Sequence, residues 1–333
     1  MPKESVSVVI PTWNRQELLQ RLLERLSVQS LRPLEVIVVD DGSEDDSAVV
    51  AGRMGAAVLR MDRNTGFAKA VNRGIQACRG ELIAILNNDV EPKADWLQTM
   101  VNGLGEAWFA SGKLLDPAHP ERLDGAFDEI ARSGCACRCG HGARDGAAWN
   151  RPRRIRLAPL TAALFRKSVF EQVGLLDERF ESYLEDVDFG IRCAVAGLDG
   201  VYVPEAVAFH RGSATLGRWH GEIVRRLARN QVFLVAKHFP AGWFWRHGWH
   251  VLVGQGLWGA IALRHSSAGA WLRGKWEGLL GYRRLRVDGA GRPGRIDPIL
   301  VEGDKIIREL QRESGLSGYW KLYSSLTGGG ASR

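Results

Sequence analysis

Residues 84–92 have the sequence Ala-Ile-Leu-Asn-Asn-Asp-Val-Glu-Pro. A buried apolar run ends here on two amides and a carboxylate, and Pro92 follows three residues later. Asn and Asp often form turns, because their side chains bond their own backbone. The alternative is an ion site, because open α/β sheets bind ligands beyond the carboxyl ends of their strands. The surrounding sequence is needed to decide between a turn and an ion site.

Apolar runs alternate with amphipathic segments over the first 90 residues. Short runs rich in Val, Ile and Leu predict buried strands at 5–12, 34–43, 55–61 and 81–89. Leucines at helical spacing predict a helix within 14–30 with Asn14 as its N-cap, and 66–80 predicts a second helix that ends near Gly80. This alternation predicts an α/β, Rossmann-like fold, in which helices cover both faces of a mostly parallel sheet.

Polar residues follow the predicted strands. In a parallel sheet these side chains meet at one edge, so they are expected to share a crevice. The residues are Thr12, Asp40, Asp41, Asn64 and Asp89. No G-x-G-x-x-G turn follows these strands, which disfavours a dinucleotide-binding protein.

The pattern changes in the second half of the chain. Residues 112–156 predict a long irregular insertion, of the kind that forms lids and binding loops. A helix is expected to begin near Glu185, and 199–210 predicts two short strands. From about Gly217 the chain is expected to be helical, and its end, 324–333, to be disordered.

Charge and tryptophan are unevenly distributed. The formal charge is +7, and residues 211–295 contain 15 Lys or Arg against three acids. Six of the twelve tryptophans lie between Trp243 and Trp276, which favours anionic lipid headgroups as partners. Nucleic acid is disfavoured, because no nucleic-acid motif accompanies the charge. Residues 249–263 would span about 22 Å as a helix, which is too short to cross a bilayer.

Five cysteines and no secretory pattern before the first strand indicate a reducing, cytoplasmic compartment. The cluster Cys135, Cys137, Cys139 and His141 suggests zinc. Structural zinc sites need a second ligand pair, and none is present in the sequence, so an ordinary loop is the prediction.

Six segments together resemble family 2 glycosyltransferases of the GT-A fold, in particular their rhamnosyltransferase-like branch. The resemblance covers residues 5 to about 215. The segments, in chain order, are SVVIPTWNR, VIVVDDGSEDDS, NTGFAKAVNRGI, AILNNDVEP, GLLDERFESYLEDVDFGIR and VAFHRGSAT. Each segment alone is weak evidence for the family, but all six in the family's order are specific evidence.

The resemblance implies a metal site. In the family an acidic motif after the fourth strand holds Mg²⁺ or Mn²⁺ against the diphosphate of a nucleotide-sugar, and Asp89 matches its last acid. Asn87 stands where many relatives have the first acid, so the diphosphate must supply much of the ligand field. His210 matches a further metal or diphosphate ligand. Without the resemblance, Asn87 to Asp89 would be interpreted as a turn.

The resemblance also implies the nucleotide and acceptor sites. Residues expected to contact the nucleotide-sugar are Thr12, Arg15, Asp40, Asp41, Asn64 and Asn88. Asp186 matches the catalytic base, which takes the proton of the acceptor hydroxyl, and Glu185 orients, caps or contacts the acceptor. Adjacent helical residues diverge by about 100°, so only one of the two faces the sugar. Asp188 is expected to pair with Arg192.

The implied activity is inverting, metal-assisted sugar transfer to a glycan or lipid-linked acceptor in cell-surface polysaccharide synthesis. Residues 1–215 would form the catalytic domain, and 216–333 would hold it on the cytoplasmic face of the membrane. Alternatives are a nucleotidyltransferase, or a degenerate domain that binds nucleotide-sugar without turnover. The Trp-rich region instead packs a helical subdomain or a homo-oligomer interface if no membrane is involved.

Overall fold

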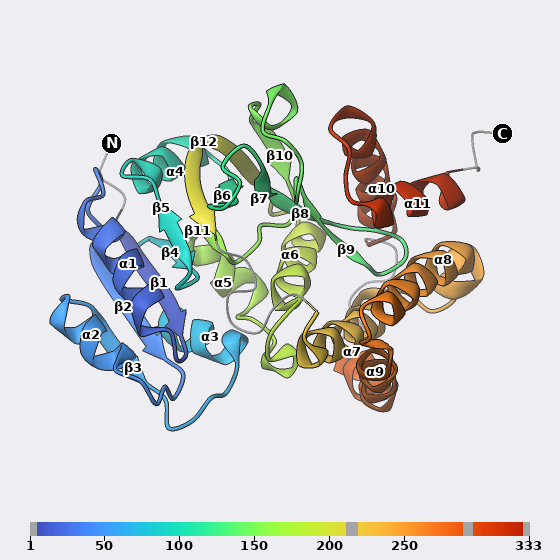
Figure 1. Cartoon of the computed structure of the whole chain (residues 1–333), viewed down its shortest axis with the longest axis horizontal. Helices are drawn as coiled ribbons and strands as arrows, with labels where there is room; N and C mark the ends of the chain where they lie inside the picture. The colour runs from blue at the N-terminus through green and yellow to red at the C-terminus, as the bar shows by residue number, and fades with distance from the viewer. Residues whose placement is uncertain (1–4, 211–218, 289–295, 329–333) are drawn as a thin grey trace. The chain divides into compact units, whose positions relative to one another are not determined.

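The computed structural model describes residues 5–210, 219–288 and 296–328 (Figure 1). The chain divides into two compact units. The first contains residues 1–127 and 144–212, and the second contains 128–143 and 213–333. The domain boundary expected between residues 215 and 216 remains a prediction.

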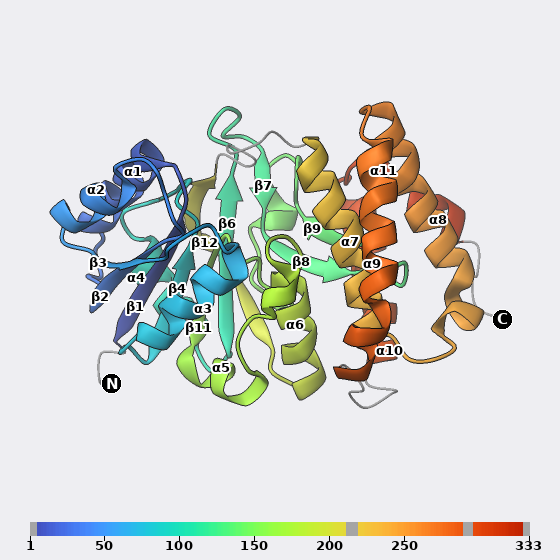
Figure 2. The same ribbon diagram turned by 90° about the horizontal axis from the view of Figure 1, so that it is seen from below.

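The first unit is built around a mixed, mostly parallel sheet. Strand order is β10-β12-β6-β11-β4-β1-β2-β3, with β5 on β12 and β7 on β6. Figure 2 shows β1 to β4, β6, β7, β11 and β12 of this sheet. Its strands are β1 (Val6–Thr12), β2 (Glu35–Asp40), β3 (Ala57–Arg60), β4 (Leu82–Leu86), β5 (Val90–Pro92), β6 (Phe109–Leu115), β7 (Leu123–Gly125), β10 (Arg153–Ile155), β11 (Ala162–Arg166) and β12 (Gly200–His210). Its helices are α1 (Gln16–Ser27), α2 (Ser47–Arg53), α3 (Phe67–Ala77), α4 (Trp96–Leu104), η1 (Ala147–Trp149), α5 (Lys167–Val173), η2 (Glu178–Phe180) and α6 (Glu185–Ala196).

Helices cover both faces of this sheet, as predicted. Val8 and Ile10 of β1 share a core with leucines of α1 and with Trp96 of α4. Val9 points to the opposite face, because side chains alternate along a strand. There Gly74 lets α3 approach so closely that an added Cβ would lie 2.4 Å from Val9.

The parallel strands carry the predicted site residues to one edge. β1 runs parallel to β2, with Thr12 opposite Asp40, and also parallel to β4. β11 is antiparallel to its neighbours β4 and β6, so β6 keeps the direction of β4, and β12 is parallel to β6. Thr12, Asp40, Asn87 and His210 therefore end or follow their strands on the same side of the sheet.

The prediction of an irregular insertion at 112–156 is wrong. These residues contribute β6, β7, β10 and the hairpin of β8 (Phe127–Ile130) with β9 (Ala136–Cys139). Buried polar residues interrupt the apolar pattern of this region. Lys113, for example, is buried in β6 and pairs with Asp145 at 2.8 Å.

Two further predictions need correction. Residues 200–210 form one strand, β12, rather than two, and its pairing with β6 shifts between Val203 and Val207, around Pro204. Asn14 is not the N-cap of α1. It has φ 50° and accepts a hydrogen bond from the Glu44 amide at 2.7 Å. A carboxylate from the next loop, Asp45, accepts from the Gln16 amide at 3.0 Å and caps the helix.

The second unit is mainly helical, as predicted. Its helices are α7 (Gly221–His238), α8 (Trp243–Arg264), α9 (Ala268–Asp288), α10 (Ile296–Glu313) and α11 (Gly318–Thr327). Asp304 of α10 is buried and accepts hydrogen bonds from Arg132 Nε at 2.6 Å and Tyr323 Oη at 3.1 Å. The expected disorder of 324–333 is wrong as far as Thr327, which ends α11, and 329–333 lie outside the described residues.

The cysteine cluster is part of this unit. Cys135, Cys137 and Cys139 are buried free thiols, the first directly before β9 and the other two within it. Within the described residues no group of three or more His, Cys, Asp or Glu side chains is arranged to hold a metal. The prediction of a loop was wrong, because Ala136–Cys139 is a strand.

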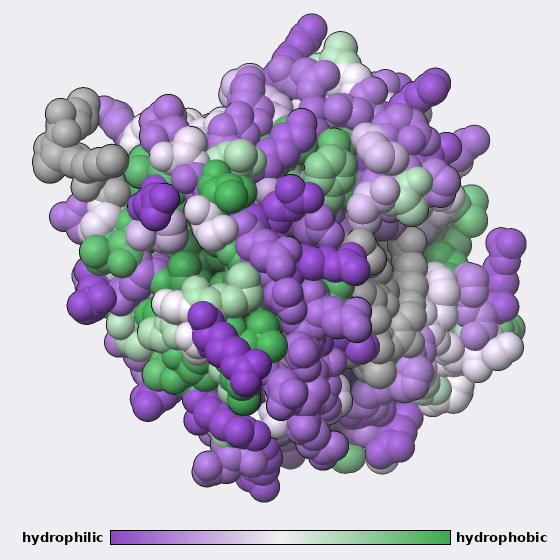
Figure 3. Space-filling view, turned by 60° about the vertical axis from the view of Figure 1, so that its left-hand side comes forward, coloured by the Kyte–Doolittle hydropathy of each residue, from purple (hydrophilic) through white to green (hydrophobic). Residues whose placement is uncertain are grey.

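The surface in Figure 3 is mostly hydrophilic, with smaller hydrophobic areas between the polar residues. In the described ranges, no helix is both long enough and apolar enough to cross a bilayer. Residues 249–263, predicted to be too short for a span, lie in the 22-residue α8, so modest hydropathy and not length excludes a crossing.

Loss of the Asp45 cap tests the local account of α1 and α2. Asp45 accepts from the Gln16 amide and, through Oδ1, from the Ser47 amide and hydroxyl. Asp45→Ala is expected to lower the free energy of unfolding by about 1–2 kcal/mol, measured by urea titration. Asp46→Ala is the control, because Asp46 makes no side-chain cap. Equal losses in both variants would contradict the assignment.

Candidate active site

Residues 87–90 form a turn, and the side chains of this turn belong to a polar site. The Asn87 amide donates to Thr161 O at 2.9 Å, and its carbonyl accepts from the Val90 amide at 3.2 Å, which closes the turn between β4 and β5. The Asn88 side chain donates to Thr12 Oγ1 at 2.9 Å. The Asn87 side-chain oxygen is buried without a hydrogen-bond partner. A buried acceptor without a partner is costly, so this position suits a ligand.

His210 lies between two carboxylates. It ends β12 opposite Val90 of β5, and its side chain is 6% exposed. Its Nε2 lies 3.3 Å from Asp89 Oδ1, and its Nδ1 lies 2.7 Å from Asp124 Oδ2. The structure thus brings together two of the residues predicted for the metal site.

Asp124 is a site residue that the sequence did not reveal. It belongs to β7, which pairs with the end of β6, and it is 86 residues from His210. Its surroundings in sequence, Leu-Asp-Gly, have no feature that separates them from a loop. Only the antiparallel pairing of β7 with β6 brings it beside the histidine.

No three His, Cys, Asp or Glu side chains of the described residues are arranged to hold a metal, so the atoms present suit a divalent metal only if a substrate adds ligands. Asp89 and Asn87 offer oxygen atoms, and His210 offers Nε2 while its Nδ1 faces Asp124. A carboxylate on the other nitrogen is the usual support of a metal-bound histidine, because it fixes the tautomer. With so few protein ligands, oxygens from a bound diphosphate would have to complete the set.

The residues predicted to contact the nucleotide lie at or beyond the ends of β1, β2 and β3. Asp40 is fully buried, accepts from the Ser43 amide at 3.0 Å through Oδ1, and has Oδ2 3.5 Å from Arg60 Nε. Asn64 is exposed beside Gly42, where any Cβ would lie 2.8 Å from the Asn64 amide. Arg15 is half-buried at the start of α1.

Asp41 is placed differently from its neighbour. Both of its oxygens accept hydrogen bonds from the loop before α3: Oδ1 from the Thr65 amide and hydroxyl at 2.8 Å, and Oδ2 from the Gly66 amide at 2.9 Å. Its carboxylate therefore fixes protein backbone.

The two acids at the start of α6 have different environments. Glu185 is 5% exposed, and Asp186 is half-buried. Burial, followed by the charge of Asp186, raises the pKa of Glu185 well above its usual value. Asp186 Oδ1 accepts from the Val187 amide at 2.8 Å. The expected pair of Asp188 with Arg192 is confirmed at 3.1 Å.

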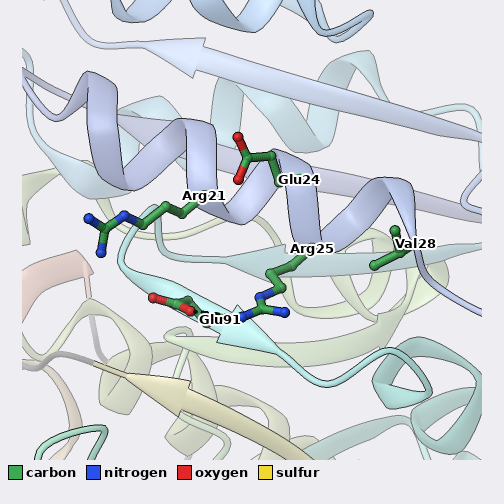
Figure 4. Close-up of a pocket in the computed structure, with 5 residues that line it drawn as sticks. All are labelled: Arg21, Glu24, Arg25, Val28 and Glu91. Carbon is green, nitrogen blue, oxygen red and sulfur yellow. Dashed lines mark ion pairs between the residues drawn. The ribbon is translucent and has the colours of Figure 1, made fainter.

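A surface hollow lies apart from these residues. It is lined by Arg21, Glu24, Arg25 and Val28 of α1 and its end, and by Glu91 of β5 (Figure 4). Arg25 and Glu91 are 3.6 Å apart within it. None of the predicted site residues lines the hollow, so it is not the candidate active site.

Comparisons with known proteins identify the class. Residues 7–117 match the family described as glycosyl transferase family 2. The chain is 30% identical over 293 residues to the N-acetylglucosaminyl-diphospho-decaprenol L-rhamnosyltransferase of Mycobacterium tuberculosis, with 77% of this chain and 90% of the relative covered. It is 32% identical over 221 residues to the pre-mycofactocin glycosyltransferase of the same species, covering 64% of this chain and 44% of that one.

Two solved structures have a similar fold. GalNAc-T7 with UDP, GalNAc and Mn²⁺ has a TM-score of 0.59 at 15% identity, covering 85% of this chain and 58% of that one. The mannosyltransferase PcManGT of Pyrobaculum calidifontis, in complex with GDP-Man and Mn²⁺, has a TM-score of 0.52 at 18% identity, covering 97% and 86%. The fold is that of GT-A glycosyltransferases. The chain belongs to glycosyltransferase family 2.

The His210 cluster predicts a pH-dependent stability in metal-free protein. Burial alone lowers the pKa of His210, but hydrogen bonds to Asp124 and Asp89 and the charges of these acids outweigh it and raise the pKa to about 9. The unfolded value is about 6.5, so the stabilisation is complete below pH 6.5 and is lost as the pH rises through 9. It amounts to about 3 kcal/mol at most.

Urea unfolding in EDTA at pH 6 and pH 9.5 measures this effect. The stability difference between the wild type and His210→Gln is expected to shrink at the higher pH. An equal difference at both values would contradict a charged histidine between the two acids.

Proposed function

We propose that the protein is an inverting, metal-assisted transferase that moves a sugar from a nucleoside-diphospho-sugar to a hydroxyl of a lipid-linked glycan. One observation carries the proposal: His210 Nε2 lies 3.3 Å from Asp89 Oδ1 at the sheet edge, and the side-chain oxygen of Asn87, two residues before Asp89, is buried without a hydrogen bond. Family membership supplies the reaction class.

The residues at the sheet edge can be assigned to parts of the nucleotide-sugar donor. Asp89, His210 and Asn87 would hold Mg²⁺ or Mn²⁺, and Asp124 keeps the histidine oriented. The metal, when bound, neutralises charge that develops on the departing diphosphate. Asp40 offers its Oδ2 toward the nucleoside, with Thr12, Asn64, Asn88 and Arg15 around it. Asp40 Oδ2 accepts no hydrogen bond and faces Nε of the exposed Arg60 side chain at 3.5 Å, which supports this role.

Asp186 is the base in the transfer step. Its carboxylate takes the proton of the acceptor hydroxyl while the oxygen forms a bond to C1 of the sugar. The bond from C1 to the diphosphate oxygen breaks, and its electron pair leaves with the nucleoside diphosphate. Attack from the opposite face inverts C1. Burial raises the pKa of Glu185 well above its usual value, which favours the neutral form of this side chain beside Asp186.

The similarity to the M. tuberculosis rhamnosyltransferase, which covers 77% of this chain, supports a particular substrate class. Its name specifies L-rhamnose as the sugar and a decaprenol diphosphate carrying N-acetylglucosamine as the acceptor. L-rhamnose and a polyprenyl-diphosphate-linked sugar are therefore the first substrates to test here, in a step of cell-surface polysaccharide synthesis.

An acceptor on a lipid calls for contact with a membrane, and the second unit has suitable side chains. Exposed apolar residues are numerous on α8 and α9: Phe244, Trp245, Trp249, Leu252, Leu263, Leu272, Trp276, Leu279 and Leu280. Trp245 is 88% and Trp276 64% exposed. α8 contains no acid, and α9 is basic, with Arg273, Arg283 and Arg284. Exposed tryptophan beside arginine fits an anionic lipid surface on the cytoplasmic side.

Asp186→Asn tests the base. The variant keeps its shape but cannot take a proton, so kcat is expected to fall by about 10³-fold while nucleoside diphosphate binding is unchanged. The measurement is nucleoside diphosphate release from a nucleoside-diphospho-L-rhamnose in the presence of polyprenyl-diphospho-N-acetylglucosamine. Glu185→Gln is the control and is expected to lose less, because its neutral amide resembles the neutral acid.

Two outcomes would contradict this account. Unchanged turnover in Asp186→Asn would contradict the assignment of Asp186 as the catalytic base. Wild-type protein that binds a nucleoside diphosphate but turns over no nucleotide-sugar would instead be the degenerate binding domain.

Liposome flotation tests the membrane surface. The protein is expected to float with vesicles of phosphatidylcholine and phosphatidylglycerol at low salt, and less well as salt rises. The double variant Trp245→Ala/Trp276→Ala should stay in the soluble fraction. Trp13→Ala, which removes an exposed tryptophan of the first unit, should float normally. No binding at low salt by the wild type would exclude the membrane surface and favour internal packing or an oligomer.

A further inference from the structure

The connector between η2 and α6 has an unusual backbone. Five residues other than glycine have positive φ in the described part of the chain, and three of them fall here: Glu181 at 59°, Tyr183 at 74° and Leu184 at 67°. L-residues with side chains rarely adopt this region, and a cluster of them persists only where surrounding structure holds it. The cluster ends directly before Glu185 and Asp186.

Glu181 is the centre of a γ-turn of the rarer, positive-φ kind. Its φ and ψ are 59° and −74°, and the Ser182 amide donates to Phe180 O at 2.7 Å across it. This turn is strained. Two residues beyond Ser182, Leu184 occupies the N-cap position of α6 in the left-handed conformation, with no side-chain cap. The direction of the first turn of α6, and so of Asp186, depends on these backbone angles.

The beginning of α3 holds the connector in place. The Ala68 amide donates to Glu181 O at 2.9 Å, and the Phe67 amide donates to Ser182 Oγ at 3.3 Å. Gly66 lies against the γ-turn so closely that an added Cβ would be 3.1 Å from Glu181 O and 3.2 Å from its Cα. Orphan amides of a helix start thus bond the strained segment.

Asp41 holds the beginning of α3 in turn. Its two oxygens accept from the Thr65 and Gly66 amides and from the Thr65 hydroxyl, at 2.8 to 2.9 Å. Both oxygens of Asp41 are thus occupied by hydrogen bonds from the protein, whereas Asp40 Oδ2 accepts none.

Asn72 anchors the other end of the same segment. Its side chain, buried in α3, donates to Leu176 O at 2.9 Å and accepts from the Leu176 amide at 2.9 Å. α3 therefore contacts the chain on both sides of η2, from Leu176 to Ser182.

We propose that Asp41, acting through the Gly66 contact and the γ-turn at Glu181, is a positioning residue for Asp186 rather than a ligand of the nucleotide. The proposal rests on Asp186 being the base of the proposed function. It assigns the second acid of the Asp40–Asp41 pair to the acceptor step and leaves Asp40 at the nucleoside.

Gly66→Ala tests the contact, with Gly55→Ala as the matched control. Both glycines have positive φ, 98° and 84°, so alanine strains the backbone at either position, but Gly55 has nothing within 4 Å of an added Cβ. Gly66→Ala is expected to lower kcat by about tenfold or more, because a small misplacement of a reacting group is costly. Gly55→Ala should lower the melting temperature but retain the wild-type kcat.

A second pair of variants, at Glu181, separates the effect of the strained backbone from the effect of the side chain. Glu181→Gly relaxes the γ-turn and is expected to lower kcat without lowering the melting temperature. Glu181→Ala removes the same carboxylate, keeps the backbone restriction, and should retain kcat. Equal kcat in both variants and in the wild type would overturn the role of the strained turn.

Asp41→Asn separates positioning from nucleotide binding. The side-chain oxygen of the variant can still accept hydrogen bonds from Thr65, but its NH2 group faces the backbone N–H of Gly66, which is also a donor. This hydrogen bond is therefore lost, and kcat should fall about tenfold. The Kd should stay within about twofold of wild type for whichever of UDP, dTDP and GDP the wild type binds with Mn²⁺. A weakened Kd with unchanged kcat would overturn the proposal. Failure of the proposed function would appear separately, as full turnover by Asp186→Asn.

Discussion

A buried imidazole between two carboxylates is the interaction on which the site depends. His210 joins three pieces of chain that are distant in sequence: the end of β4 through Asp89, the end of β12 through itself, and β7 through Asp124. An unpaired charge in this position would be costly, so the three groups stabilise each other only as a set. Their assembly requires β7 to fold back on β6 and β5 to pair with β12.

Under the proposed function, Asp89 would be the single acid of the metal-binding motif, because Asn87 stands at the position of the other. Asn87 contributes a neutral oxygen, so the local negative charge comes from Asp89 and, behind the histidine, Asp124. A site of this kind binds a cation weakly by itself and more strongly with a diphosphate, because the substrate supplies the missing oxygens. Under the proposed function, donor binding and metal binding are therefore coupled.

Much of the first unit could be predicted from the sequence, because its buried strands are continuous apolar runs. β1, β2 and β4, the helices α1, α3 and α6, and the pair Asp188–Arg192 follow from period and spacing alone. The region 112–156 could not be predicted, since its strands bury polar residues such as Lys113 and Asp124 whose partners lie far along the chain. The Asp45 cap of α1 escaped prediction for a similar reason, because it comes from the neighbouring loop, whereas the local pattern pointed to Asn14. The resemblance to the family supplied the chemistry that periodicity could not.

Calorimetric titration of the full chain with UDP, dTDP and GDP, each with Mn²⁺ and with EDTA, tests the central claim most directly. The account predicts that one nucleoside diphosphate binds, that EDTA abolishes or strongly weakens the binding, and that Asp89→Ala has the same effect in the presence of Mn²⁺. Binding that is equal with Mn²⁺ and EDTA, or no binding of any nucleotide by folded protein, would contradict a metal-assisted transferase site at the Asp89–His210 cluster.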